Sequence, residues 1–147
     1  MKNALYYLIL IVSLTCACTY NNVYLNREED NNEGKVLLKK FYSNVINENY
    51  RGVDEMVGSS IKILGGPHVV RKLVKFINSK VGKCKGYTIE DRYIRRTTGS
   101  INETSYNYKL KVTYDKGTIN EVIGFIKRDG SESKINAYQA NSDLLMN

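Results

Sequence analysis

The spacing of apolar and polar residues changes about halfway along this chain of 147 residues. Between residues 35 and 48 the apolar positions recur every three or four residues, which predicts an amphipathic helix. Residues 49–57 predict a shorter helix of the same kind. Gly65-Gly66-Pro67 then interrupts the chain, and we expect a third helix from there to Gly82, because proline favours the first helical turn and glycine the end. Its apolar stripe consists of Val70, Leu73, Val74, Ile77 and Val81, widened by Val69 and Phe76.

The second half of the chain has the two-residue period of β-strands. From Tyr106 to Tyr114, tyrosines and aliphatic residues alternate with Asn, Lys and Thr, which predicts a half-buried strand. Asp115-Lys116-Gly117 and Asp129-Gly130 predict tight turns between strands. The four expected strands cover residues 87–96, 106–114, 119–127 and 134–140. The sequence therefore predicts an α+β fold, with three N-terminal helices packed on a four-stranded antiparallel sheet.

The first residues of the chain have the features of an export signal. Lys2 is followed by an apolar stretch from Ala4 to Leu14. This stretch is shorter than the roughly 20 residues that a membrane span requires, and it has the length of the apolar region of a secretory signal peptide. We expect residues 1–17 to be a signal peptide.

The end of this signal resembles the lipobox of bacterial lipoproteins, in which a small residue precedes the cysteine that is lipidated and becomes the mature N-terminus. The segment reads Leu14-Thr15-Cys16-Ala17-Cys18. Ala17 precedes Cys18, whereas the larger Thr15 precedes Cys16, so the resemblance implies lipidation at Cys18. A secreted protein cleaved after Ala17 and an uncleaved anchor are the alternatives. Lipidation would place the protein on the extracytoplasmic side of the cell membrane or the outer membrane.

The composition of the remaining residues indicates three segments: a tether, a folded domain and a tail. Residues 18–34 are polar and rich in asparagine, and we interpret them as a lipidated N-terminus with a flexible tether. Residues 35–141 are the expected folded domain, and residues 142–147 a C-terminal tail. Cys84 is then the one cysteine left for the mature domain. Neighbouring Lys83 and Lys85 favour a lowered thiol pKa, but without a partner for catalysis we interpret Cys84 as a small, partly buried residue in a turn.

The order of these elements resembles that of small bacterial lipoproteins with a cystatin/NTF2-like domain. The likeness rests on the helix motif Phe41-Tyr42-x-x-Val45-Ile46-x-x-x-Tyr50 and on the closing segments 121–130 and 135–138. It implies a curved sheet that wraps the long helix into a cone. Enzymes of this superfamily place Asp, Tyr or His inside the cone, and the alternation of Asp91 with Tyr87 and Ile89 would direct Asp91 there.

The sequence contains no pattern typical of a catalytic or metal site. There is one histidine, His68, which follows Pro67 at a helix start, where a capping or solvent-facing role is expected. No cluster has the spacing of metal ligands, and Gly58-Ser59-Ser60 does not fit the nucleophile motif Gly-x-Ser-x-Gly. We therefore predict no catalytic residue, no cofactor and no metal.

Positive charge is concentrated in one segment. The chain has 22 Lys+Arg against 15 Asp+Glu, a net charge of +7, and residues 57–88 contain seven of the cations and no acidic residue. On the third helix Arg71, Lys72 and Lys75 are expected to oppose the apolar stripe. This basic face predicts an anionic partner in the envelope, such as headgroups, wall polymers or an acidic protein, more than nucleic acid; the alternative is a solvated helix face.

Together these features predict a membrane-anchored extracytoplasmic binding module rather than an enzyme. The alternative is a small-ligand carrier or an enzyme that uses the cone as its pocket.

Overall fold

The structure is a computed structural model that describes residues 20–146. The predicted signal peptide and both lipobox cysteines, Cys16 and Cys18, lie outside these residues. The elements in chain order are β1 (Asn21–Leu25), α2 (Glu28–Ile46), α3 (Tyr50–Met56), α4 (Ser59–Gly65), α5 (Val69–Val81), β2 (Cys84–Gly99), β3 (Glu103–Tyr114), β4 (Gly117–Arg128), β5 (Lys134–Asn141) and the 3₁₀ helix η1 (Asp143–Leu145).

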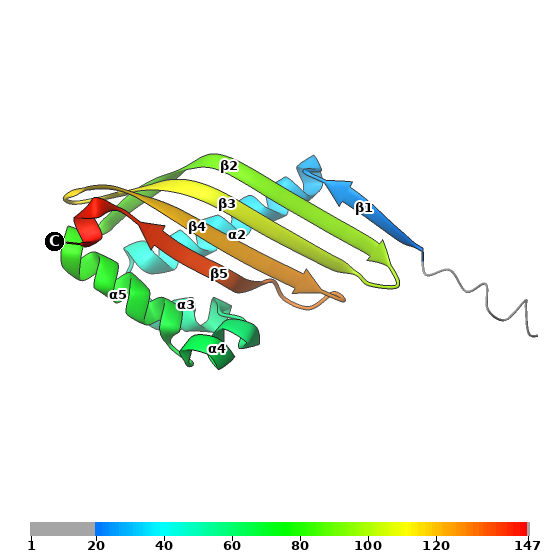
Figure 1. The fold of residues 1–147 in the computed structure, drawn as a ribbon, viewed down its shortest axis with the longest axis horizontal. Coiled ribbons are helices and arrows are strands. Elements are labelled where there is room, and N and C mark those ends of the chain that lie inside the picture. Colours follow the sequence, from blue (N-terminus) through cyan, green and yellow to red (C-terminus); the bar gives the residue numbers. More distant parts are fainter. Residues whose placement is uncertain (1–19, 147) are drawn as a thin grey trace, which may run out of the picture.

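The strands form one open antiparallel sheet in which each strand pairs with its neighbours in sequence, in the order β1-β2-β3-β4-β5. The long helix α2 crosses one face of this curved sheet, and α3, α4 and α5 gather toward one end (Figure 1). The predicted α+β class with an antiparallel sheet is confirmed. Within residues 20–146 the sheet has five strands rather than four, and four α-helices are present rather than three.

The additional strand lies in the segment that we predicted to be a tether. Within 18–34, residues 21–25 form β1 and α2 begins at Glu28, so the described part of this segment belongs to the fold. Asn26, in the left-handed region at φ 49°, connects the two elements. Its side chain accepts a hydrogen bond from the Ile94 amide, and its own amide donates to the Ile94 carbonyl, both at 2.9 Å. Polar residues hold β1 against β2 here, and so hydrophobic periodicity did not predict it.

The start of α2 is tied to the sheet by a buried carboxylate. Asp30, which is 2% exposed, accepts hydrogen bonds from Arg27 (2.8 Å) and from Arg96 of β2 (3.0 Å). Hydrogen bonding to the Arg27 guanidinium lowers the pKa of Asp30, and Arg96 adds to this effect. The ionised Asp30 therefore joins the first turn of α2 to strand β2 of the sheet.

The predicted third helix is confirmed as α5, whose stripe of Val70, Val74, Ile77 and Val81 is buried. Helix α4 was not predicted, because none of its residues is buried and it has no apolar periodicity. The predicted C-terminal tail also differs: it contains η1, which contacts α5, and Leu145 packs against the core.

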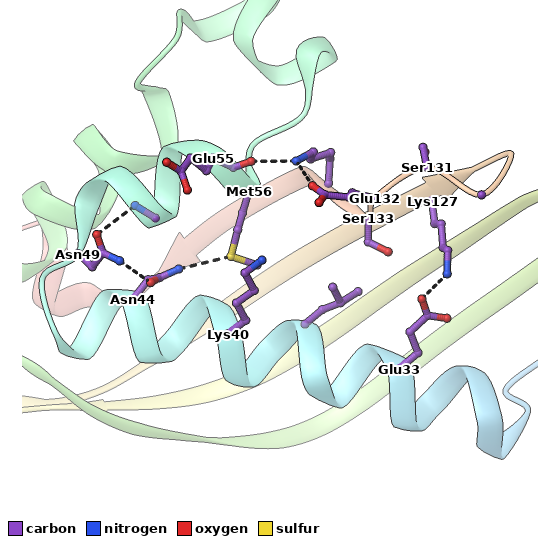
Figure 2. A pocket seen from close by; sticks show the side chains of 14 residues that line it. Glu33, Lys40, Asn44, Asn49, Glu55, Met56, Lys127, Ser131, Glu132 and Ser133 are labelled. Carbon is purple, nitrogen blue, oxygen red and sulfur yellow. Dashed lines mark hydrogen bonds and ion pairs between the residues drawn. The ribbon is translucent and has the colours of Figure 1, made fainter.

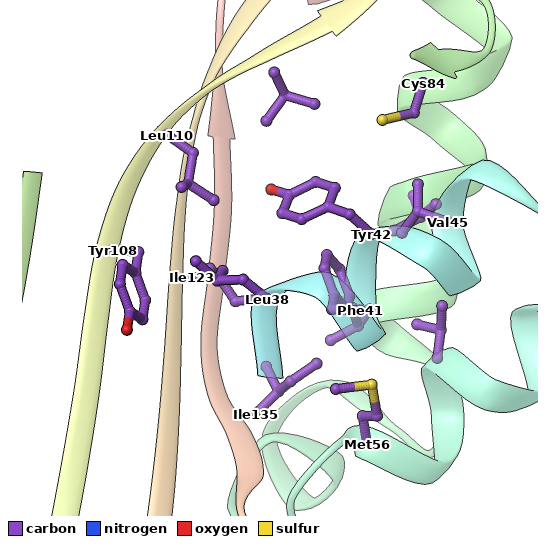
Figure 3. Close-up of a cluster of buried hydrophobic side chains, with 14 of the residues drawn as sticks. Leu38, Phe41, Tyr42, Val45, Met56, Cys84, Tyr108, Leu110, Ile123 and Ile135 are labelled. Atoms are coloured by element: carbon purple, nitrogen blue, oxygen red, sulfur yellow. The ribbon is translucent and has the colours of Figure 1, made fainter. Parts of the chain in front are cut away.

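The core lies between α2 and the inner face of the sheet. Phe41 and Tyr42 of α2 project toward Leu110 of β3 and Ile123 of β4 (Figure 3). The alternation predicted for β3 is confirmed, since its even-numbered residues from Thr104 to Tyr114 are all buried. Tyr108 of β3 is paired with Ile123 of β4, so the buried inner face continues from β3 to β4.

Candidate binding groove

The inner face of the sheet is closed where the cone pocket was expected. Phe41, Tyr106 and Tyr108 are each 0% exposed. Gly34 of α2 lies directly against Tyr108, and a Cβ added at this glycine would be 1.9 Å from the tyrosine Oη. Because a larger residue would not fit, Gly34 permits the close approach of helix and sheet. Side chains therefore fill the space that the carrier or enzyme alternative would need.

Asp91 does not point into this inner space. A β-bulge between Ile89 and Asp91 shifts the register by one residue, so that Asp91 pairs with the outward-facing Lys109. The Asp91 side chain is 65% exposed, and its Oδ2 lies 3.7 Å from the Lys109 Nζ. The expected inward orientation is wrong, because strict alternation from Ile89 does not account for the inserted residue.

A polar groove of about 790 Å³ opens between helices α2 and α3 and the turn that joins β4 to β5. Its volume is within the range of small-molecule sites. Figure 2 shows Lys40 extending from α2 into this space, with Met56 on one side and Glu132 and Ser133 across from it. The groove is lined by Glu33, Leu37, Lys40, Asn44, Asn49, Gly52, Glu55, Met56, Lys127, Gly130, Ser131, Glu132, Ser133 and Lys134.

Ion pairs fix the wall formed by the β4–β5 turn. The Nζ atom of Lys127 lies 2.5 Å from Glu33 Oε1 and so joins β4 to α2. The Nζ atom of Lys134 donates to the Glu132 carboxylate (2.9 Å) and to the Glu55 carbonyl of α3 (3.0 Å). Burial would raise the pKa of Glu33, but interactions led by the hydrogen bond from Lys127 outweigh burial and lower it. The carboxylate of Glu33 is therefore ionised and adds a negative charge to the groove lining.

The opposite wall is formed by amides. Asn49 caps the start of α3, because its Oδ1 accepts from the Gly52 amide at 3.2 Å. Its Nδ2 donates to Asn44 Oδ1 at 2.9 Å, and Asn44 in turn donates to the Met56 sulfur at 3.6 Å. With the serines of the turn and the apolar Leu37, the groove offers donors, acceptors and both signs of charge. This arrangement suits a polar ligand that makes many hydrogen bonds.

No sequence pattern predicts this groove. Its residues come from two helices and a turn that are distant in the chain, and none has a motif. Ser131 and Ser133 have the residue type expected of any turn, and their place in the groove follows only from the position of the turn opposite α2.

The three residues of the predicted basic face have different surroundings. Lys72 is exposed. Arg71 Nη1 lies 3.2 Å from Asp54 Oδ2, and the same carboxylate is 2.9 Å from Nδ1 of His68. Lys75 Nζ lies over the Tyr50 ring, 4.7 Å from its centre. Two of the three cations therefore interact with residues of α3. His68 occupies the N-cap position of α5, but its side chain does not form the capping hydrogen bond.

A buried carboxylate that sequence reasoning missed lies at the other end of the inner face. Glu121 of β4 is 1% exposed and accepts hydrogen bonds from three tyrosine hydroxyls. The donors are Tyr114 (2.6 Å), Tyr42 (2.8 Å) and Tyr138 (2.8 Å). Burial raises the pKa of Glu121, although the three hydrogen bonds act in the opposite direction. The signal was available, because Glu121 occupies an inward position between Ile119 and Ile123.

Cys84 lies close to this cluster at the start of β2 and is buried, at 3% exposed. Burial and the charge of Glu121 raise the pKa of its thiol to about 11. The interpretation as a small buried residue agrees with its surroundings, although Cys84 begins a strand rather than lying in a turn.

No group of three or more His, Cys, Asp and Glu side chains is placed to hold a metal ion in residues 20–146. None of the helices described there has both the length and the apolar character needed to cross a membrane.

The chain was compared with known proteins. It matches no family model, no curated protein and no solved structure. The likeness to cystatin/NTF2-like lipoproteins therefore stays a prediction.

Proposed function

We propose that this protein is a lipid-anchored, extracytoplasmic binding module of the cell envelope, attached through Cys18. The observation that carries the proposal is the spacing between the anchor and the fold: β1 begins at Asn21, three residues after the lipobox cysteine. A folded domain that follows the lipid directly is held at the membrane surface. The two or three acyl chains of a bacterial lipoprotein suffice for stable attachment without a spanning helix.

The proposed binding surface is the groove between α2, α3 and the β4–β5 turn. Support comes from its volume of about 790 Å³ and from the mixture of cations, carboxylates and amides that line it. The expected ligand is polar and rich in hydrogen-bonding groups. No metal or cofactor is part of this proposal.

The finer fold assignment is also a proposal. A long helix on the inner face of a curved antiparallel meander supports a cystatin/NTF2-like arrangement. The alternative function, a carrier or enzyme that uses an inner cavity, has less support because Phe41, Tyr106 and Tyr108 fill that space.

An anionic partner on the basic face is a second candidate, favoured by the absence of acidic residues between 57 and 88. Changing Arg71, Lys72 and Lys75 together to glutamine should then weaken binding to anionic vesicles, and salt should weaken the parent protein's binding. The protein tested must retain residues 21–34, because β1 and the start of α2 lie there. Unchanged vesicle binding with an unchanged melting temperature would identify this face as simply solvated.

Acyl labelling tests the anchor. Cells that produce the full chain should incorporate labelled fatty acid into the parent protein and into Cys16→Ser, and both proteins should sediment with membranes. Cys18→Ser should carry no label and should accumulate as a soluble or unprocessed protein. Loss of label in Cys16→Ser alone would show that the wrong cysteine was assigned, and an unlabelled parent protein would overturn the proposal.

A further inference from the structure

We propose that the domain lies with one defined side against the bilayer that holds its anchor, and that the β2–β3 turn and helix α4 are the two regions in contact with lipid. This inference rests on the proposed attachment through Cys18. It adds which surface meets the membrane and which side chains enter the headgroup layer.

The first argument is the short reach between anchor and fold. Two peptide units separate Cys18 from Tyr20, a distance of at most about 7 Å. From Asn21 onward the chain is paired with β2 over five positions, beginning with Asn21 opposite Gly99. Attachment at Cys18 would therefore leave the domain little freedom to rise or turn above the membrane.

The β2–β3 turn is held beside this attachment point. Asn21 Oδ1 accepts a hydrogen bond from the Ile101 amide at 3.3 Å. An added Cβ at Gly99 would lie 2.2 Å from the Tyr20 carbonyl oxygen, so this backbone approach requires glycine. Tyr20 and Ile101 are 75% and 59% exposed. An aromatic and an aliphatic side chain are thus exposed where the anchor enters the bilayer, and tyrosine is a residue that favours the membrane interface.

The second contact region is α4, where Ile61 packs against the core but Ile63 and Leu64 are exposed. Leu64 and Ile63 are 89% and 83% exposed, more than any other large apolar side chain in residues 20–146. The helix has no buried residue. Two adjacent apolar residues on a short projecting helix are suited to insertion among headgroups and upper acyl chains.

One flat surface can touch both regions. In Figure 1 the N-terminal end of β1 and the β2–β3 turn lie at the right end of the molecule and α4 lies at the bottom, with no other element beyond the line that joins the turn to α4. A bilayer placed along this line meets the β2–β3 turn at one end and α4 at the other. The β4–β5 turn, which forms one wall of the groove, lies between them, so the groove would be reached at the level of the headgroups.

Charge supports the same orientation. Helix α4 carries Lys62 and no acidic residue, and it belongs to the segment 57–88, which has seven cations and no acidic residue, as expected for a segment that meets anionic lipid. Glu90 and Asp91 belong to the bulge of β2, the strand that arches over the opposite side of the molecule in Figure 1. Asp91 is therefore the position for a control label away from the proposed membrane plane.

Depth measurements on the full, membrane-bound chain test the proposal. An environment-sensitive fluorophore is attached to Leu64→Cys, Ile101→Cys or Asp91→Cys, each in a Cys84→Ala background, and the purified proteins are placed in vesicles of phosphatidylglycerol and phosphatidylethanolamine. We expect the labels at 64 and 101 to emit at shorter wavelength and to be quenched at least fivefold more than the label at 91 by lipids with a quencher on the upper acyl chain. Ile63→Cys provides a second label on α4.

The outcomes separate this inference from the anchor. If the protein is acylated and stays with the vesicles, but positions 63, 64 and 101 are quenched no more than 91, the orientation is wrong and the anchor stands. If the protein is not acylated and remains soluble, both proposals are overturned.

Discussion

Two faces of α2 border regions of opposite character. The face with Leu38, Tyr42 and Val45 meets a closed interior, where the carboxylate of Glu121 is held by three neutral tyrosine hydroxyls. On the other face Glu33 lines the open groove with Lys40 and Asn44, and its carboxylate is held by the cation of Lys127. The same kind of group therefore has its pKa raised in the closed region and lowered in the groove. Solvent access and the charge of the hydrogen-bonding partner determine whether the pKa of the carboxyl group is raised or lowered.

This difference suggests a division of roles between two faces of one helix. The closed region provides the packing that makes the fold stable, and the groove provides polar groups that are fixed by ion pairs yet open to solvent. Substitutions in the first should change the free energy of unfolding, and substitutions in the second should leave it nearly unchanged.

The largest expected effect is at Phe41. Its ring packs against Tyr42 and Tyr138, with ring centres 5.1 and 5.3 Å away. Phe41→Ala should reduce the free energy of unfolding by about 3–5 kcal/mol, whereas Leu37→Ala, in the groove, should reduce it by about 1 kcal/mol. Urea denaturation of the chain without its signal peptide measures both. Equal losses would mean that the groove wall contributes as much as the closed core.

Gly34 tests how tightly helix and sheet are packed where the two regions meet. Alanine has the higher helix propensity and would by itself stabilise α2 by about 1 kcal/mol. Because its Cβ would overlap the Tyr108 hydroxyl, we expect Gly34→Ala instead to destabilise the protein by about 2–3 kcal/mol. Tyr108→Phe removes a buried hydroxyl that has no hydrogen-bond partner, so it should have little effect alone and should restore part of the loss. A stabilised Gly34→Ala protein would contradict the packing described here.

Glu121 and Glu33 should give opposite pH dependences. Below about pH 4.5 Glu121 is protonated in both states; as the pH rises, the unfolded chain loses this proton first, because burial raises the folded pKa. The parent protein should therefore lose stability relative to Glu121→Gln as the pH rises above 4.5. The Glu33 contribution, from a lowered pKa, should be present above pH 4.5 and lost toward lower pH. Denaturation curves between pH 3 and 8 measure both differences, and a parallel pair of profiles would refute the contrast.

The smallest effect concerns Cys84. With a pKa of about 11 and 3% exposure, its thiol should react with a disulfide reagent at pH 8 at least about 100-fold more slowly in the folded protein than in urea. Absorbance of the released thiol measures the rate. Fast reaction in the folded state would mean that the closed region opens readily.

The closed region could largely be predicted from the sequence, and the groove could not. Helix α5 and strand β3 each bury a single apolar face, so their apolar residues recur regularly. Local sequence patterns are therefore sufficient to predict these two elements. Asn26 and Asp30 hold β1 and the start of α2 through polar contacts, which periodicity does not detect. Asp91 was misplaced by one inserted residue at a bulge. The groove depends on the position of the β4–β5 turn opposite α2, and local sequence patterns do not indicate which distant segments face each other.

The central claim is that this anchored domain binds its ligand in the groove and not at the other surfaces of the sheet. The most direct test is crosslinking in living cells, with a photoreactive amino acid in place of Ser131 in the groove or of Thr113 on the outer face of β3. We predict a discrete adduct from position 131 that is absent from 113 and is lost when Asn44→Ala and Lys40→Ala are introduced together. Equal adducts from both positions, or none from 131 in membrane-bound protein, would contradict the account.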